Sequence, residues 1–160
     1  MTNNSLNESE KEMIRQWYYK SLPDYFSAFT TLWIAFNAYY KRKFPGSGGD
    51  HNMVKSLYKD PKHQNLFDNL LKGEDFSKAV ENLMKELCSN PLRNMDTGKE
   101  YKIHDKRKME EVFEVLYIVR NNLFHGDKKI DIKRDEKIVK LSYQILRLFM
   151  KEIISKDFKK

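Results

Sequence analysis

The sequence predicts an all-α fold, and three observations support this prediction. Apolar residues recur at spacings of three and four over several long segments, as they do on one face of a helix. Helix breakers are scarce, with six Gly and four Pro among 160 residues. No stretch shows the sustained apolar and polar alternation that is typical of half-buried strands. We therefore expect one domain over residues 1–160, built as a compact helical bundle.

Local signals set the ends of the expected helices. Ser21-Leu22-Pro23-Asp24 predicts a turn, because the residue before a proline disfavours helical geometry. Pro61 suits a first helical turn, and Gly73 suits a helix end. Residues 1–8 are expected to be disordered, and the segments 44–50 and 90–105 are expected to be loops. The helices are expected over residues 8–21, 24–43, 51–58, 61–71, 75–87, 106–124 and 134–155.

Apolar stripes along these helices identify the expected core. In the first helix, Met13 and Trp17 are expected to face inward. The second helix carries a heavy aromatic stripe, and the sixth and last helices carry mostly aliphatic ones. The three stripes comprise Phe26, Phe29, Trp33, Phe36 and Tyr40; Met109, Val112, Phe113, Leu116, Val119, Leu123 and Phe124; and Ile138, Leu141, Ile145, Leu148 and Phe149.

Composition narrows the classes of partner. A net charge of +7 and a pI near 9.3 favour an anionic partner, with nucleic acid as the first candidate. The alternative is that the lysines, which are spread along the chain, only confer solubility. No window approaches the roughly 18 uninterrupted apolar residues of a membrane span, and the polar start does not resemble a signal peptide. We expect a cytoplasmic protein with no membrane partner.

The sequence also excludes several kinds of site. His51, His63 and His104 have no partners at metal-ligand spacing, so neither a metal site nor a cofactor is expected. The glycine cluster within 44–50 lacks the following lysine and hydroxyl residue of a phosphate-binding P-loop. The single cysteine, Cys88, cannot form an internal disulfide and is expected to pack within an apolar helix face.

The sixth helix ends with an arginine inside its apolar stripe, in the sequence Arg120-Asn121-Asn122-Leu123-Phe124-His125-Gly126. A charge on a buried face costs several kcal/mol unless it is paired. Asn121 and His125 are four residues apart and stack on one flank of the stripe, whereas Asn122 points elsewhere. Arg120 and His125 lie about 140° apart on an ideal helix, a gap that the long arginine side chain and relaxation near Gly126 are expected to close.

A second polar residue interrupts the aromatic stripe of the second helix. Asn37 lies among Trp33, Phe36 and Tyr40, and a buried amide needs hydrogen-bond partners. Because Asn37 and Arg120 both lie on inner faces of apolar helices, we expect them to be near each other. Asn37 would then orient Arg120 or the loop around His125, and we assign it as a supporting residue.

The segment from Arg120 to His125 resembles the Arg-x4-His signature of the HEPN superfamily, small α-helical domains of prokaryotic toxins, CRISPR-associated ribonucleases and defence systems. Asn121 matches the polar residue that commonly follows the arginine. The sequence Leu32-Trp33-Ile34-Ala35-Phe36-Asn37-Ala38-Tyr39-Tyr40 also resembles the aromatic early helix of several HEPN families. The resemblance implies a HEPN-type bundle with extra helices inserted between the aromatic helix and the motif helix.

The resemblance implies a metal-independent endoribonuclease of the hydrolase class, which cleaves single-stranded RNA. His125 would transfer protons and Arg120 would hold the scissile phosphate. Asn121 would orient His125 or a phosphate oxygen, and Asn122 would have a supporting role. A homodimer with a composite site would supply a second histidine. The products would be a 2′,3′-cyclic phosphate and a 5′-hydroxyl, and DNA would be spared.

Biologically, the resemblance implies a role in a toxin–antitoxin or phage-defence system. RNA and a neighbouring antitoxin or defence protein are the implied partners. Some HEPN toxins carry a modified tyrosine two residues after the histidine, where this chain has Asp127. Regulation by modification of that tyrosine is therefore not expected here.

The residues also admit structural interpretations. Arg120 could form a buried ion pair with a glutamate of another helix, or it could cap backbone carbonyls, and His125 could cap a helix end through the helix dipole. The alternative function is a non-catalytic HEPN-like module that binds RNA, a nucleotide or a protein.

Overall fold

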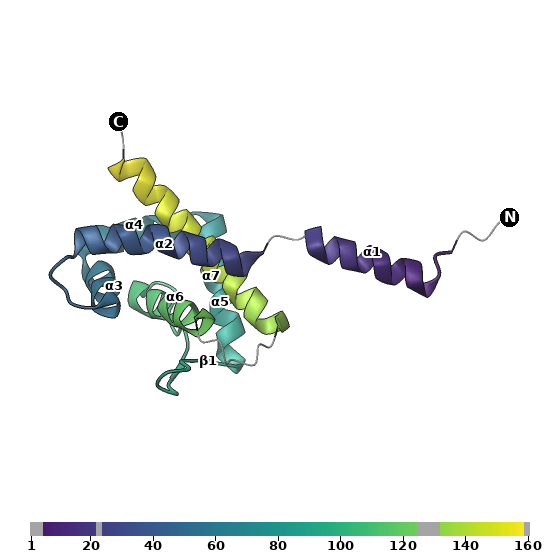
Figure 1. Cartoon of the computed structure of the whole chain (residues 1–160). Helices are drawn as coiled ribbons and strands as arrows, with labels where there is room; N and C mark the ends of the chain where they lie inside the picture. Colours follow the sequence, from purple (N-terminus) through teal and green to yellow (C-terminus); the bar gives the residue numbers. More distant parts are fainter. Residues whose placement is uncertain (1–4, 22–23, 125–131, 159–160) are drawn as a thin grey trace.

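The computed structural model describes residues 5–21, 24–124 and 132–158, and helices make up most of this part of the chain (Figure 1). The prediction of a mostly helical fold is confirmed. In chain order the helices are α1 (Glu8–Ser21), α2 (Tyr25–Lys43), α3 (Asp50–Lys59), α4 (Pro61–Leu71), α5 (Glu74–Ser89), α6 (Met109–Leu123) and α7 (Ile132–Asp157). Three of these, α3, α4 and α5, lie between the aromatic helix α2 and the motif helix α6.

Capping residues explain why several helices begin where they do. The side chain of Asp24 accepts hydrogen bonds from the backbone N–H groups of Phe26 and Ser27 and so begins α2. Asp60 accepts from the backbone of His63, and Pro61 occupies the first turn of α4. The loop predicted over 44–50 ends one residue earlier, because Asp50 is already the first residue of α3.

The predicted loop over 90–105 contains a small hairpin between α5 and α6. Strands β1 (Leu92–Arg93) and β2 (Glu100–Tyr101) pair antiparallel, with Leu92 opposite Tyr101. Gly98 closes the turn with a φ of +73°, a left-handed geometry that disfavours other residues. The hairpin is too short for the alternating pattern that identifies a strand in a sequence.

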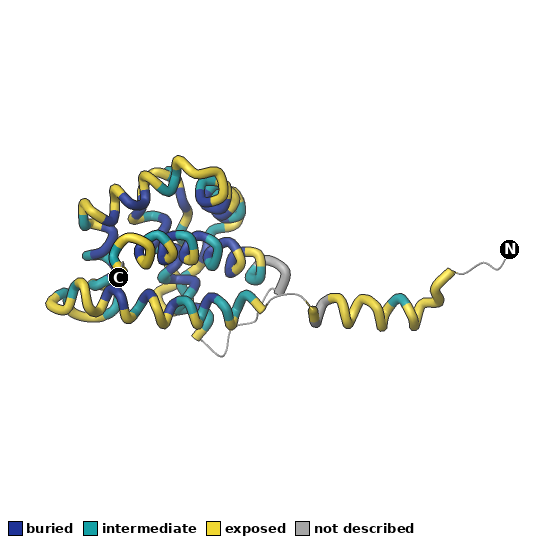
Figure 2. Tube along the Cα trace, turned by 90° about the horizontal axis from the view of Figure 1, so that it is seen from above, coloured by how far each residue is buried: buried dark blue, intermediate teal, exposed yellow. Residues whose placement is uncertain are grey.

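The core lies between α7, which packs against α2 and α5, and α6, which packs against α3 (Figures 1 and 2). Phe113 of α6 is fully buried, and its ring centre lies 4.8 Å from that of Phe149 and 5.9 Å from that of Phe36. These tilted and edge-on aromatic pairs join α2, α6 and α7. All members of the three predicted stripes are buried or half-buried except Phe124, which is exposed.

The prediction that Met13 and Trp17 of α1 face inward is wrong. Helix α1 projects from the bundle (Figures 1 and 2), and Met13 and Trp17 are 53% and 66% exposed. Periodicity identifies an apolar face but does not identify what covers it. Cys88 is likewise exposed near the end of α5, where we expected it to pack. Of the residues expected to be disordered, 1–4 lie outside the described residues.

None of the described helices is both long enough and apolar enough to cross a membrane.

Candidate functional site

Arg120 lies in the last turn of α6, where 26% of its side chain is accessible. Its Nη1 donates a hydrogen bond to Oδ1 of Asn121 at 2.8 Å, and its guanidinium carbon lies 5.0 Å from the centre of the Phe124 ring. Its Nε is buried and makes no hydrogen bond within the described residues. Asn121 and Phe124 thus hold part of the guanidinium. The N–H groups of Nη1 and Nη2 that these contacts do not use can bind other partners.

The carboxylate of Asp50 links Arg120 to Asn37. Nη2 of Arg120 lies 3.8 Å from Oδ2 of Asp50, and the amide of Asn37 donates to Oδ1 at 3.4 Å. Asn37 also donates to the hydroxyl of Tyr40 at 2.6 Å, and Nζ of Lys41 lies 3.7 Å from Oδ1 of Asp50. The structure therefore brings Asn37, Asn121 and Arg120 into one polar cluster at the start of α3. The sequence analysis did not identify Asp50.

The ion pair with Asp50 does not by itself account for the position of Arg120. Both side chains are half-buried, and their closest contact of 3.8 Å is long for a charged pair. Such a pair contributes about 0–1 kcal/mol, whereas an uncompensated buried charge costs several kcal/mol. Arg120 instead keeps an accessible part that can bind an anion from solution.

The pKa of the Tyr40 hydroxyl depends on burial and on the neighbouring Asn37, Asp50 and Arg120. Burial raises the pKa of the Tyr40 hydroxyl, and the hydrogen bond from Asn37 opposes this change. The Asp50 carboxylate raises the pKa of Tyr40 further, while the positive charge of Arg120 lowers it. Tyr40 is therefore a neutral hydroxyl near pH 7 that accepts a hydrogen bond from Asn37 and does not transfer protons there.

Asn122 is not part of this cluster. It is buried, with 4% of its surface exposed, and its amide donates to the backbone oxygen of Arg93 at 2.9 Å. Its Oδ1 accepts from the backbone N–H of Met95 at 3.1 Å. Asn122 therefore attaches α6 to β1 and the residues that follow it.

His125 lies outside the described residues, as does Gly126. The separation of His125 from Arg120, and its proposed role, thus stay predictions. Helix α6 ends at Leu123, and the backbone N–H of Phe124 donates to the oxygen of Asn121 at 3.1 Å.

The sequence analysis also missed a histidine beside the cluster. His51 follows Asp50 in the first turn of α3, and its Nε2 lies 2.9 Å from both carboxylate oxygens of Glu114 on α6. Its ring stacks on Tyr117, with ring centres 4.5 Å apart and planes within 6° of parallel. Tyr58 donates its hydroxyl to Oε1 of Glu114 at 2.7 Å. Because Glu114 is 63 residues from His51, sequence spacing gave no signal for this pair.

A second polar cluster joins α2, α4 and α7. The hydroxyl of Tyr39 lies 2.7 Å from Nε2 of His63 and 3.3 Å from Oδ2 of Asp157, and Nδ1 of His63 lies 2.5 Å from Asp60. Burial raises the pKa of Tyr39, and the Asp157 charge adds to this change. Since Tyr39 and His63 are both buried, this cluster fixes the helices and is closed to a substrate.

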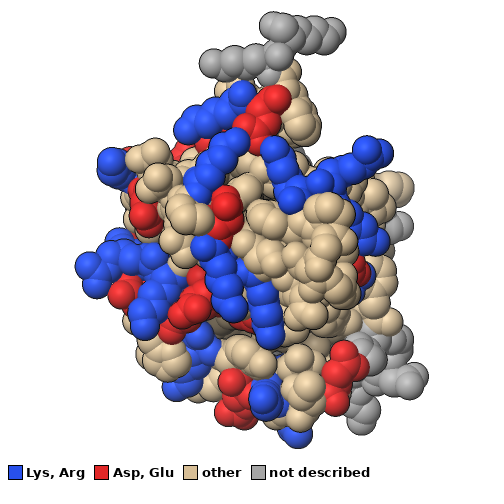
Figure 3. All heavy atoms as spheres, turned by 90° about the vertical axis from the view of Figure 1, so that its left-hand side faces the viewer, with Lys and Arg blue, Asp and Glu red and all other residues tan. Residues whose placement is uncertain are grey.

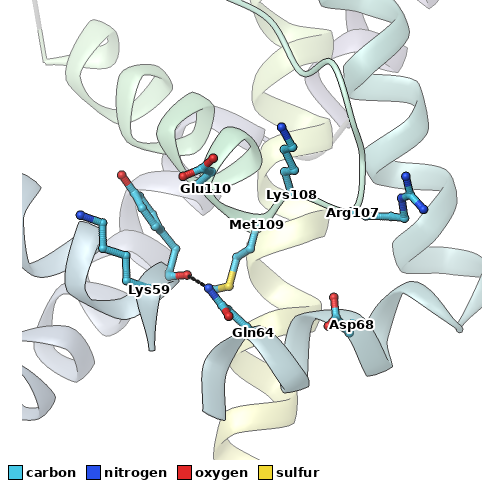
Figure 4. Close-up of a pocket in the computed structure, with 8 residues that line it drawn as sticks. Lys59, Gln64, Asp68, Arg107, Lys108, Met109 and Glu110 are labelled. Atoms are coloured by element: carbon cyan, nitrogen blue, oxygen red, sulfur yellow. Dashed lines mark hydrogen bonds between the residues drawn. The ribbon is translucent and has the colours of Figure 1, made fainter. Parts of the chain in front are cut away.

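A pocket of about 350 Å³ lies between the end of α3, α4 and the start of α6 (Figure 4). Its lining residues are Tyr58, Lys59, Gln64, Asp68, Arg107, Lys108, Met109 and Glu110. In Figure 4 the basic groups of Lys59, Lys108 and Arg107 lie around an opening that also carries two carboxylates. Arg120 does not line this pocket. The pocket carries both positive and negative side chains, so its charge does not favour one class of ligand.

Basic side chains are not gathered into one continuous patch on the face at the left of Figure 1. Lys and Arg are spread over this face with Asp and Glu between them, next to an area without charged side chains (Figure 3). A nucleic acid on this face would therefore meet scattered cations.

Among the described residues, no group of three or more His, Cys, Asp or Glu side chains is arranged to hold a metal ion. No protein-family model, curated protein or solved structure matches the chain. What the protein does must therefore be inferred from its own residues.

Proposed function

We propose that this protein is a metal-independent endoribonuclease that cleaves single-stranded RNA through attack of the 2′-hydroxyl. The observation that carries the proposal is the guanidinium of Arg120, held at the end of an apolar helix by Asn121 and Asp50 yet partly accessible. A fixed guanidinium is suited to bind the two non-bridging oxygens of a phosphodiester and the charge that develops in the transition state.

In this mechanism Arg120 binds the scissile phosphate and Asn121 orients its guanidinium. His125 transfers protons, because an imidazole exchanges them readily near neutral pH. The 2′-oxygen attacks phosphorus and the bond to the 5′-oxygen breaks, so the products are a 2′,3′-cyclic phosphate and a 5′-hydroxyl. DNA is spared because it lacks the 2′-oxygen.

The resemblance to HEPN proteins supports the same activity and extends the proposal to assembly and biology. A homodimer would place two copies of the motif across one cleft, and the protein would act as a toxin or in phage defence. A neighbouring antitoxin or defence protein is the corresponding partner, and the cytoplasm is the corresponding location.

The test is cleavage of a single-stranded RNA in EDTA by the wild-type protein and two variants, Arg120→Ala and His125→Ala. Wild type should yield cyclic-phosphate ends, and each variant should lose about 100-fold or more in rate. Arg107→Ala and His104→Ala are matched controls, because both side chains are exposed and paired away from the site. They should cleave at the wild-type rate, and DNA of the same sequence should stay intact.

One observation favours the alternative of a non-catalytic binding module. The Asp50 carboxylate faces Arg120 and competes with a phosphate for it. If pure wild-type protein binds RNA, and Arg120→Ala weakens binding without any cleavage by wild type, the binding module is correct and the ribonuclease is excluded.

A further inference from the structure

His51 has the surroundings of a proton-transfer residue. It is 40% exposed, so it is open to a ligand, whereas its partner Glu114 is mostly buried. Flat stacking on Tyr117 prevents the imidazole from turning about its side-chain bonds.

The contact with Glu114 fixes the state of the imidazole. A carboxylate accepts hydrogen bonds, so Nε2 of His51, 2.9 Å from both oxygens, carries the proton. Nδ1 of the neutral ring then has a free lone pair, and it makes no hydrogen bond within the described residues. Glu114 therefore fixes both the tautomer and the orientation of the ring. The bond from Tyr58 holds Glu114 in place.

The same contacts place His51 beside Arg120. Asp50, which contacts the guanidinium, directly precedes His51 in the chain. Tyr117, which stacks on the His51 ring, precedes Arg120 by three residues, about 4.5 Å along the axis of α6. The His51 ring and the Arg120 guanidinium therefore both lie at the contact between the start of α3 and the last turns of α6.

We propose that His51 is a second catalytic histidine of the site, with Glu114 as its positioning residue. This role rests on the function proposed above. Nδ1 of His51 takes the proton of the 2′-hydroxyl, the 2′-oxygen forms a bond to phosphorus, and the bond to the 5′-oxygen breaks. The leaving 5′-oxygen takes its proton from His125, to which the proposed function gives proton transfer.

His51→Gln tests the catalytic role in the RNA-cleavage assay. We expect a loss of about 100-fold or more in kcat/KM and loss of the limb of the pH profile that rises with pH. The matched control is His104→Gln. His104 also pairs with a glutamate of α6, Glu111, but this pair lies at the opposite end of the helix from Arg120 and the His104 side chain is exposed. The role of His51 is wrong if His51→Gln cleaves within about threefold of His104→Gln and keeps the rising limb.

Glu114→Gln tests the positioning role through kcat and KM. Without the carboxylate that accepts from Nε2, the imidazole loses its fixed tautomer and orientation, so kcat should fall about 10-fold or more while KM stays within about threefold. Glu111→Gln, on the same helix, is the control. A purely structural Glu114 would lower the rate only as far as the variant loses folding. Circular dichroism and urea unfolding of each variant identify any loss of folding.

A second measurement separates failure of this role from failure of the ribonuclease. The ring resonances of His51 are followed by NMR while a 2′-deoxy oligonucleotide, which cannot be cleaved, is added. They should shift in the wild-type protein and not in Arg120→Ala. A wild type that cleaves RNA without any shift of His51 overturns this inference alone. A wild type that shows the shift but no cleavage overturns the ribonuclease, and with it the catalytic role of His51.

Discussion

Asn37 and Arg120 contact opposite oxygens of one carboxylate, that of Asp50, at 3.4 Å and 3.8 Å. The two residues come from different helices, and Asp50 begins a third, so this carboxylate links α2, α3 and α6 at the site. Lys41 adds a second cation within 3.7 Å. The carboxylate therefore both orders the site and lowers its attraction for an anion.

Asp50→Asn should increase the affinity for single-stranded nucleic acid. The amide has nearly the same shape but lacks the charge that competes with a phosphate for Arg120, and we expect a gain of about 3- to 10-fold, or about 0.7–1.4 kcal/mol. Fluorescence anisotropy with a labelled 2′-deoxy oligonucleotide measures the change. Asp68→Asn on the exposed face of α4 makes the same change in net charge. An equal gain in both variants would assign the effect to net charge and not to Asp50.

Asn122→Ala should destabilise the fold. Its amide makes two hydrogen bonds to the backbone of Arg93 and Met95, and truncation leaves both backbone groups without that partner. We expect a loss of about 1–3 kcal/mol in the free energy of unfolding by urea. Asn121→Ala, which removes one half-exposed partner of Arg120, should cost less than about 1 kcal/mol. Equal losses would show that the contacts of Asn122 with the hairpin do not stabilise the protein.

The contribution of Asp24 should depend on pH. Hydrogen bonds from the side chain and the backbone of Ser27 lower the pKa of the Asp24 carboxyl in the folded protein. A lowered pKa means that the stabilisation is present above the unfolded value of about 3.9 and is lost as the pH falls through the folded value. Asp24→Ala should therefore cost about 1 kcal/mol at about pH 7 and much less at about pH 2.

Urea unfolding at both pH values measures this difference. Asp68→Ala, in the middle of α4, removes a carboxylate that caps no helix and should show no such dependence on pH. A cost for Asp24→Ala that stays the same at both pH values would contradict the capping role.

The sequence predicted the helices well because their signals are local. Asp24 marks the start of α2 through its capping side chain, and Pro61 marks the start of α4 through its fixed φ. The observed bounds differ from the expected ones by a few residues. The face of α1 was predicted wrongly because the spacing of Met13 and Trp17 identifies a helix but not its partner.

Part of the candidate site could also be predicted, again for a physical reason. A charge and an amide on apolar helix faces need partners, and this drew attention to Arg120 and Asn37. Asp50 and His51 look like ordinary polar residues beside a glycine-rich loop. Their partners are on α6, and only the packing of α3 against α6 reveals them.

The long separation of His51 from Glu114 has a consequence for synthesis of the chain. Sixty-three residues must be added after His51 before its partner exists, which takes about 3–13 s at usual translation rates. Until α6 leaves the ribosome, neither Arg120 nor the restraints on His51 are present, although α2 and α3 can already form. On the proposed function, the nascent chain gains its RNA-cleaving site, and with it any action on the RNA of its own ribosome, only when the motif helix docks.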